Sequence, residues 1–266
     1  MAGDVAGRDR LDRVLTERGT FPSRTAAARA IRAGQVKLGT DGPLALRPSQ
    51  EVDREQDVVI IGERPFVSRG GTKLANALES LEVDVTGLSC LDVGASTGGF
   101  TDCLLQRGAG RVIALDVAYG QIDDSLRRDP RVEVIERLNA RSLVPDDLPF
   151  RPELAVIDVS FISLKKVLPA VVGAMADGGR ILAMVKPQFE LGKGRVGRGG
   201  VVRDPEDRRE AVLGVADFAR ELGLGLLGVA PTGLPGPKGN LETFLFLDTG
   251  GGGVEDAASL CEGVDL

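Results

Sequence analysis

The feature that most constrains this chain is an apolar run, residues 88–93, that ends in a glycine-rich turn. The run is bounded by Gly87 and Gly94, which is typical of a short buried strand. Glycines at 94, 98 and 99 leave room where the backbone turns tightly or approaches a ligand. Apolar residues recur at 100, 103 and 104 before Gly108, which predicts a helix. A strand, a glycine turn and a helix form the first half of a nucleotide-type site.

Asp116 ends the next apolar run, residues 112–115, where a Rossmann-like fold places a carboxylate for ribose hydroxyls. The turn is not a P-loop, because no Lys-Ser or Lys-Thr pair follows its last glycine, and its spacing is not that of a G-x-G-x-x-G fingerprint. The pattern therefore favours an adenosine-containing cofactor that has a ribose and needs no phosphate site. The alternative is a turn that only packs a strand against a helix.

Composition excludes several kinds of chemistry. The sequence contains no histidine, which rules out Ser-His-Asp catalysis and histidine-ligated metals, so proton transfer falls to Lys, Asp, Glu, Cys or the single tyrosine. Three scattered cysteines without metal spacing predict free thiols in a reducing compartment and no metal. No signal peptide, lipidation motif or long apolar segment is present, so a soluble cytoplasmic protein without a membrane partner is expected. With a net charge of -6, any nucleic-acid surface must be local.

The first part of the chain is locally basic. Apolar spacing predicts two short helices that end at Gly19 and Gly34, followed by strands at 36–38 and 58–61. Arg24, Arg29 and Arg32 share a broad arc of the second helix, as phosphate contacts require, and a solvated helix face is the alternative. The motifs resemble the S4-type RNA-binding module over residues 8–62; they are Arg10-Leu11-Asp12, Ser23-Arg24 and Gly34-Gln35-Val36. Residues 63–67, which contain a proline, are expected to form a linker.

Strands and helices alternate through the rest of the chain, which predicts a mostly parallel sheet covered on both faces. Strands are expected at 88–93, 112–116, 132–135, 154–159, 181–185, 224–229 and 243–247. Helices are expected at 68–81, 98–107, 122–128, 164–175 and 205–222. Ligands of such sheets bind beyond the carboxyl ends of the strands. Residues 250–266 are glycine-rich and acidic, and we expect a flexible tail without a site.

Several predicted strand ends carry unusual polar residues. Asp158 ends the fourth strand, Lys186 ends the fifth, and Asn139 follows the third, where it is placed to bond an adenine edge. A lysine at the end of a buried strand is costly unless it is paired, and Asp158 is the expected partner. A purely structural ion pair is the alternative interpretation. Glu242 lies between a turn rich in proline and glycine and an apolar strand, a position suited to delivering a carboxylate into a cleft.

The order of Lys73, Asp158, Lys186 and Glu242 resembles the Lys-Asp-Lys-Glu set of ribose 2′-O-methyltransferases of the FtsJ type. Together with the S4-like segment, residues 95–101, 160–164 and 185–190 resemble the TlyA family of rRNA cytidine 2′-O-methyltransferases, some of which are called haemolysins. The resemblance implies an α/β, Rossmann-like S-adenosylmethionine-dependent methyltransferase domain at 68–249, preceded by a small α+β S4-like RNA-binding domain. It implies ribosomal RNA or ribosomal subunits as partners and no obligate protein partner.

The resemblance also assigns roles. Lys73, Asp158, Lys186 and Glu242 form the expected catalytic set, with Lys186 as the base that deprotonates the ribose hydroxyl. S-adenosylmethionine is expected at Gly94, Ser96, Thr97, Gly98, Gly99, Phe100, Asp116 and Asn139, and RNA at Arg10, Arg24, Arg29, Arg32, Arg69 and Lys193. The 2′-hydroxyl distinguishes RNA from DNA, which accounts for an RNA-binding module ahead of such a site. A target nucleotide in a helix must also be turned out of the stack.

Two other functions stay open from the sequence. A membrane-lytic protein is suggested by the haemolysin label, but neither a spanning segment nor a basic amphipathic helix with an aromatic face supports it. The second is a catalytically idle RNA-binding or ribosome assembly factor that retains the fold.

Overall fold

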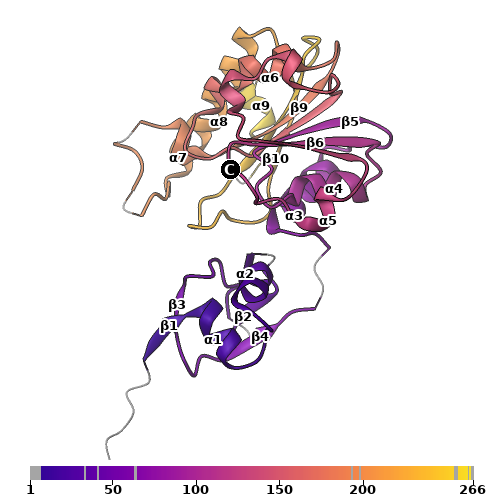
Figure 1. Ribbon diagram of the computed structural model, residues 1–266. Coiled ribbons are helices and arrows are strands. Elements are labelled where there is room, and N and C mark those ends of the chain that lie inside the picture. The colour runs from indigo at the N-terminus through magenta and orange to yellow at the C-terminus, as the bar shows by residue number, and fades with distance from the viewer. Residues whose placement is uncertain are drawn as a thin grey trace, which may run out of the picture. The chain divides into compact units, whose positions relative to one another are not determined.

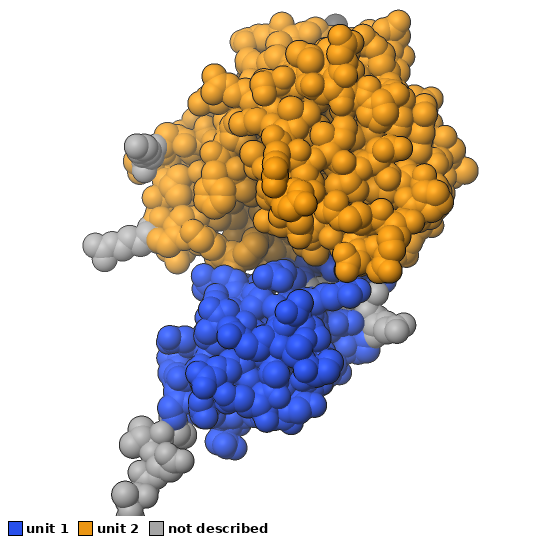
Figure 2. All heavy atoms as spheres, in the orientation of Figure 1, with its two compact units in different colours: residues 1–69 blue, residues 70–266 orange. Residues whose placement is uncertain are grey.

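The computed structural model describes residues 7–32, 34–40, 42–62, 65–192, 194–197, 199–254, 257–262 and 264. The chain forms two compact units, residues 1–69 (unit 1) and residues 70–266 (unit 2) (Figures 1 and 2). Lys193 and residues 63 and 64 of the expected linker lie outside the described residues.

Unit 2 contains a seven-stranded sheet in the order β10-β11-β9-β8-β5-β6-β7. All neighbouring strands from β9 to β7 pair in parallel, whereas β11 is antiparallel to both β9 and β10. Six strands therefore share one direction, and the prediction of a mostly parallel, Rossmann-like sheet is confirmed. The strands are β5 (Ser89–Val93), β6 (Arg111–Asp116), β7 (Val132–Glu136), β8 (Leu154–Ile157), β9 (Arg180–Val185), β10 (Gly225–Pro231) and β11 (Thr243–Asp248).

Helices cover both faces of this sheet, with α3, α4 and α5 on one side and α6, α8 and α9 on the other (Figure 1). Alternate strand residues, such as Leu91 and Val93, join α6 and α8 in one large apolar core, while Phe100 of α4 packs on Phe244 from the opposite face. Burial on both faces explains why the strands are continuous apolar runs. The helices are α3 (Arg69–Ser80), α4 (Gly99–Gln106), α5 (Asp124–Arg127), α6 (Leu168–Ala174), α7 (Pro187–Glu190), α8 (Pro205–Glu221) and α9 (Ala257–Leu260), with 3-10 turns η1 (Ala140–Ser142), η2 (Pro145–Asp147) and η3 (Leu164–Lys166).

The sheet order reverses at β5, whose neighbours are β6 on one side and β8 on the other. At its carboxyl end, Val93 O accepts a hydrogen bond of 2.9 Å from Asp158 N. Gly94 follows with φ +86°, and a Cβ there would lie 2.4 Å from Asp158 O. Only glycine fits, because both the backbone conformation and the close approach exclude a side chain. This reversal is the point at which open α/β sheets bind ligands.

Some predicted boundaries were wrong for identifiable reasons. The helix expected at 164–175 is divided into η3 and α6, because Pro169 has no N–H to donate and must lie in the first turn of a new helix. The helix expected at 122–128 begins only at Asp124, since the Asp123 side chain caps it by accepting from Ser125 N. Strand β8 ends at Ile157, so Asp158 is the first residue after the strand.

Unit 1 contains α1 (Leu11–Glu17) and α2 (Arg24–Arg32) with two antiparallel strand pairs. One pair joins β2 (Val36–Leu38) to β4 (Val58–Ile60), near the predicted strands, and the other joins β1 (Arg8–Arg10) to β3 (Glu51–Asp53). Leu11, Leu15 and Ile31 are fully buried in its core. The unit is thus a small α+β body with its own apolar core, and its likeness to an S4-type module stays a prediction.

Candidate active site

The glycine turn is held in place by a buried carboxylate of β5. Asp92 Oδ2 accepts hydrogen bonds from Thr101 N (2.9 Å) and Thr101 Oγ1 (2.7 Å), so it satisfies one of the free N–H groups in the first turn of α4. Gly98 provides the backbone cap with φ +94° and has no side chain to do so itself. Our sequence reasoning missed Asp92, although a lone acidic residue inside an apolar run was the available signal.

Asp92 is fully buried, and burial raises its pKa to about 7, with the nearby Asp158 and Asp116 carboxylates adding to the rise and the two hydrogen bonds from Thr101 opposing it. Its second oxygen, Oδ1, has no hydrogen-bond partner among the described residues. A buried acceptor without a partner is costly, so Asp92 Oδ1 is an unsatisfied polar atom near the carboxyl end of β5.

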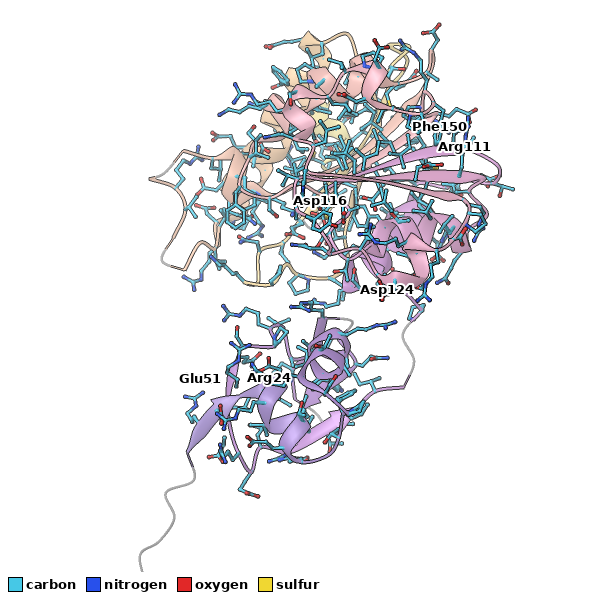
Figure 3. The ribbon with its side chains drawn as sticks, viewed as in Figure 1. Arg24, Glu51, Arg111, Asp116, Asp124 and Phe150 are labelled. Atoms are coloured by element: carbon cyan, nitrogen blue, oxygen red, sulfur yellow. The ribbon has the colours of Figure 1, made fainter. Side chains whose placement is uncertain are left out.

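Asp116 lies at the carboxyl end of β6 and contacts the glycine turn (Figure 3). The other end of β6 is marked by Arg111, whose guanidinium lies 3.7 Å from the centroid of the Phe150 ring (Figure 3). Asp116 accepts from Ser96 N through Oδ2 and from Ala118 N through Oδ1, both at 2.7 Å. Ser96 has φ +50° and is exposed, so the turn presents backbone beside this carboxylate.

The other predicted cofactor residues differ in their burial and in their hydrogen-bond partners. Thr97 O accepts a hydrogen bond of 3.1 Å from Asp123 N, and Gly98 and Gly99 are buried at the start of α4. Phe100 is buried against Phe244 at a ring-centroid distance of 5.8 Å, so its side chain faces the core. Asn139 Oδ1 accepts from Arg141 N at 3.0 Å and thereby caps η1. For Phe100 and Asn139, a structural role is therefore evident.

Lys73 and Glu242 form a buried ion pair between α3 and the start of β11. The side chain of Glu242 is only 2% exposed, and Gly236 lies so close that a Cβ there would be 2.6 Å from Glu242 Oε1. The turn before Glu242 is anchored by Asn240, whose side chain accepts from Val202 N (2.9 Å) and donates to Gly200 O (2.8 Å). This pair is sealed from solvent and rigidly held.

Lys186 and Asp158 form a second ion pair, with Nζ 2.5 Å from Oδ1. Lys186 Nζ also donates a hydrogen bond of 2.8 Å to Ser160 Oγ. In contrast to Glu242, the side chain of Asp158 is 28% exposed, and Ser160 is exposed as well. Lys186 itself is buried, with 10% of its side chain exposed, but its two partners reach the solvent at this edge of the sheet.

Strand register brings the two ion pairs to one edge of the sheet. Thr243 of β11 pairs with Val185 of β9, so Glu242 and Lys186 are the next residues opposite one another. Asp158 directly follows the end of β8, the other neighbour of β9, and lies beside Gly94. The structure thus gathers Lys73, Asp158, Lys186 and Glu242 beyond the carboxyl ends of the central strands, next to the glycine turn.

The predicted RNA contacts of unit 1 include an arginine pair. The buried Asp12 carboxylate accepts from Arg10 Nε (3.0 Å), Arg10 Nη2 (2.9 Å) and Arg24 Nη2 (3.3 Å), and Arg10 lowers the pKa of Asp12. The two arginine side chains remain 47% and 56% exposed. Arg29 and Arg32 are exposed on α2, and Arg69 is half-buried at the start of α3.

Two kinds of feature are absent from the part of the chain that the structure describes. Within it, no group of three or more Cys, Asp or Glu residues is placed to hold a metal ion. Nor does any described helix combine the length and the apolar character that crossing a membrane requires.

Comparisons with known proteins point in one direction. The model of the FtsJ-like methyltransferase family matches residues 66–249. The 16S/23S rRNA (cytidine-2′-O)-methyltransferase TlyA of Mycobacterium tuberculosis is 51% identical over 92% of this chain and 91% of its own length. A solved structure of a hemolysin candidate from Streptococcus thermophilus matches with a TM-score of 0.76 and 36% identity, covering 97% of this chain and 94% of that one. An S-adenosylmethionine-dependent methyltransferase from Mesorhizobium loti (TM-score 0.50, 15% identity, covering 66% and 97%) shares the fold alone.

The raised pKa of Asp92 predicts a pH-dependent stability. Because its pKa is about 7 in the folded state and near 3.8 when unfolded, the folded state holds the proton more tightly, and stability falls as pH rises from about 4 to 7. We expect Asp92→Asn, which keeps an acceptor for Thr101, to remove this part of the dependence, up to about 4 kcal/mol for the full shift. Urea unfolding from pH 5 to 8 measures it.

The exposed Asp177→Asn variant serves as the control, and its free energy of unfolding should follow the wild type at every pH. If the difference between wild type and Asp92→Asn stayed constant over this range, the buried carboxyl would not titrate as described.

Proposed function

This chain belongs to the TlyA group of the FtsJ-like methyltransferase family, and we propose that it methylates the 2′-oxygen of a cytidine in ribosomal RNA with S-adenosylmethionine as donor. The observation that carries the proposal is the pair of lysine–carboxylate contacts beside the glycine turn. The relative with 51% identity is named for this reaction and is matched over nearly its whole length.

The residues present fit the donor. Asp116 offers carboxylate oxygens to ribose hydroxyls, and each oxygen accepts one backbone hydrogen bond, so lone pairs remain. The backbone of Gly94, Ser96 and Thr97, at the carboxyl end of β5, suits the amino-acid end. S-adenosylmethionine supplies a methyl group already activated on a sulfonium, so the protein must align and deprotonate the acceptor.

Lys186 is the better base of the two lysines. Lys73 is closed into a buried ion pair with Glu242, whereas Lys186 contacts the exposed Ser160 and the partly exposed Asp158. A general base must reach the proton it removes, which favours the lysine whose partners are open to solvent. Lys186 Nζ is placed to take the hydroxyl proton, and Asp158, 2.5 Å from that nitrogen, would stabilise the resulting ammonium.

Two further features support RNA as the substrate. Asp12 holds Arg10 and Arg24 side by side with their outer N–H groups exposed, an arrangement that suits a phosphodiester. In unit 2, the ring of Phe161 is 90% exposed and directly follows Ser160, so a base turned out of its stack finds an aromatic face beside the lysine.

The proposal is tested by transfer of tritiated methyl groups from S-adenosylmethionine to isolated small- and large-subunit rRNA and to intact subunits, with mapping of 2′-O-methyl sites. We expect incorporation at cytidine with the wild type and a loss of about 100-fold or more with Lys186→Ala, since a general base contributes about that much. Lys166→Ala, an exposed lysine of η3, should keep wild-type activity.

The outcomes separate the alternatives. Absence of incorporation into every RNA, with donor binding intact, contradicts the enzymatic proposal and favours an idle RNA-binding or assembly factor. Unchanged methylation by Lys186→Ala removes Lys186 as the base. Leakage of liposomes by the purified protein without RNA or donor would revive the membrane-lytic alternative.

The exposed Phe161 ring predicts a stacking contribution. Phe161→Ala should lower kcat/KM for RNA by about 10- to 100-fold, because stacking of one base on an aromatic ring is worth about 1–3 kcal/mol. The melting temperature should stay near that of the wild type, since the ring is 90% exposed. Phe161→Tyr should retain activity and Phe161→Leu should not. Equal activity of the leucine variant would show that apolar bulk, and not a ring face, is what matters.

The arginine pair predicts a salt-dependent contribution to RNA binding. Arg10→Ala and Arg24→Ala should each weaken RNA binding and reduce the slope of log K against log salt by about one, as loss of one phosphate contact does. Each variant leaves the other guanidinium on Asp12, so unit 1 should stay folded. Filter binding between 50 and 200 mM salt measures the effect.

The matched control is Arg13→Ala, which removes an arginine of the same unit that is paired with Glu17 and Asp9. If Arg13→Ala changed the salt slope as much as the other two variants, binding would reflect the general charge of unit 1 and not the arginine pair.

A further inference from the structure

Ser160 lies in the site but is not one of the four residues assigned to catalysis. Its hydroxyl accepts the hydrogen bond from Lys186 Nζ at 2.8 Å, and the Asp158 carboxylate lies 2.5 Å from the same nitrogen. Both acceptors belong to the short loop after β8, two residues apart. The side chain of Lys186 is otherwise largely buried, so its amino group is held by a hydrogen bond to the Ser160 hydroxyl and by an ion pair with the Asp158 carboxylate.

The geometry of an amine gives these two contacts a consequence. A neutral lysine nitrogen is bonded to Cε and carries two N–H groups and one lone pair, in roughly tetrahedral directions. The hydrogen bond to Ser160 fixes the direction of one N–H group, and the Asp158 carboxylate attracts the other, so the lone pair has one direction left. With the carboxylate alone, the amino group can rotate about the Cε–Nζ bond, and the lone pair is no longer aimed.

The loop that carries Ser160 is itself held against the segment after Lys186. Glu190 of α7 accepts from Ser163 Oγ (2.6 Å) and Leu164 N (2.8 Å). Between these bonds and the Lys186–Ser160 contact, the rings of Phe161 and Phe189 pack with centroids 5.3 Å apart, and Phe161 has φ +65°. The loop is therefore tied at one end to Lys186 and at the other to Glu190, and Ser160 is not a freely moving surface side chain.

We propose that Ser160 is a positioning residue that aims the lone pair of Lys186 at the ribose 2′-hydroxyl. The inference rests on the proposed role of Lys186 as the base. In this arrangement Lys186 Nζ receives the hydroxyl proton in the one direction left open, while its existing N–H groups stay on Ser160 and Asp158. Ser160 itself exchanges no proton, so its contribution is alignment, and a misaligned proton acceptor lowers the rate of the chemical step without weakening substrate binding.

The test compares Ser160→Ala and Ser160→Thr with the wild type in the methyl-transfer assay. We expect Ser160→Ala to lower kcat by about 10- to 100-fold with KM for RNA and for S-adenosylmethionine unchanged within about twofold. Ser160→Thr restores the hydroxyl, and the exposure of this position leaves room for the extra methyl, so it should recover most of kcat. Calorimetric binding of S-adenosylmethionine and a melting curve verify that each variant is folded.

The outcomes distinguish this inference from the function on which it rests. No methylation by the wild type contradicts the proposed function. Wild-type activity that is lost in Lys186→Ala but unchanged in Ser160→Ala overturns the role of Ser160 alone. A fall in kcat that threonine fails to restore, or a rise in KM of the same size, also overturns it, because the loop and not the hydroxyl would then be the cause.

Discussion

The close approach of Gly94 to the backbone of Asp158 is the constraint on which the site depends. It joins the first turn after β5 to the first residue after β8, across the point where the sheet order reverses. A Cβ at Gly94 would lie 2.4 Å from Asp158 O, so any side chain there would push the glycine turn and the carboxylate apart. The loop suited to the methyl donor and the carboxylate paired with Lys186 are therefore parts of one backbone arrangement.

The two lysine–carboxylate pairs differ in the exposure of their carboxylates, and this difference suits them to different roles. Glu242 is 2% exposed and Asp158 is 28% exposed, although both lie at the same edge of the sheet. Loss of one partner from a buried pair leaves an unpaired charge and costs about 3–5 kcal/mol, so the Lys73–Glu242 pair is well suited to fixing α3 against β11. The more exposed pair has less to lose from a change of protonation, which is what a base must undergo.

Much of this arrangement was predictable because its residues follow apolar runs of recognisable length. Asp116 ends β6, and Gly94, Asp158 and Lys186 each directly follow a strand, and the carboxyl ends of parallel strands meet at one edge. The features that were not predicted depend on residues that are distant in the sequence or on very short strands. The hydrogen bond from Lys186 to Ser160 requires the pairing of β8 with β9, and β1 and β3 are three residues each, too short for a pattern. The break before α6 was readable, since Pro169 cannot lie inside a helix.

Both units use the same physical device, a carboxylate that holds cations in place while part of each cation stays available. Asp12 fixes two arginines that remain about half exposed, and Asp158 fixes a lysine together with Ser160. A long basic side chain loses about 2 kcal/mol of rotamer freedom when it is ordered, and a carboxylate that orders it in advance removes that cost from substrate binding. The carboxylate also cancels part of the positive charge that attracts RNA. Affinity for RNA in general is therefore lower, and the position of each cationic group is better defined. For a methyltransferase that must modify one oxygen among many similar ones, geometry is the more useful of the two, because phosphate contacts alone carry no sequence information.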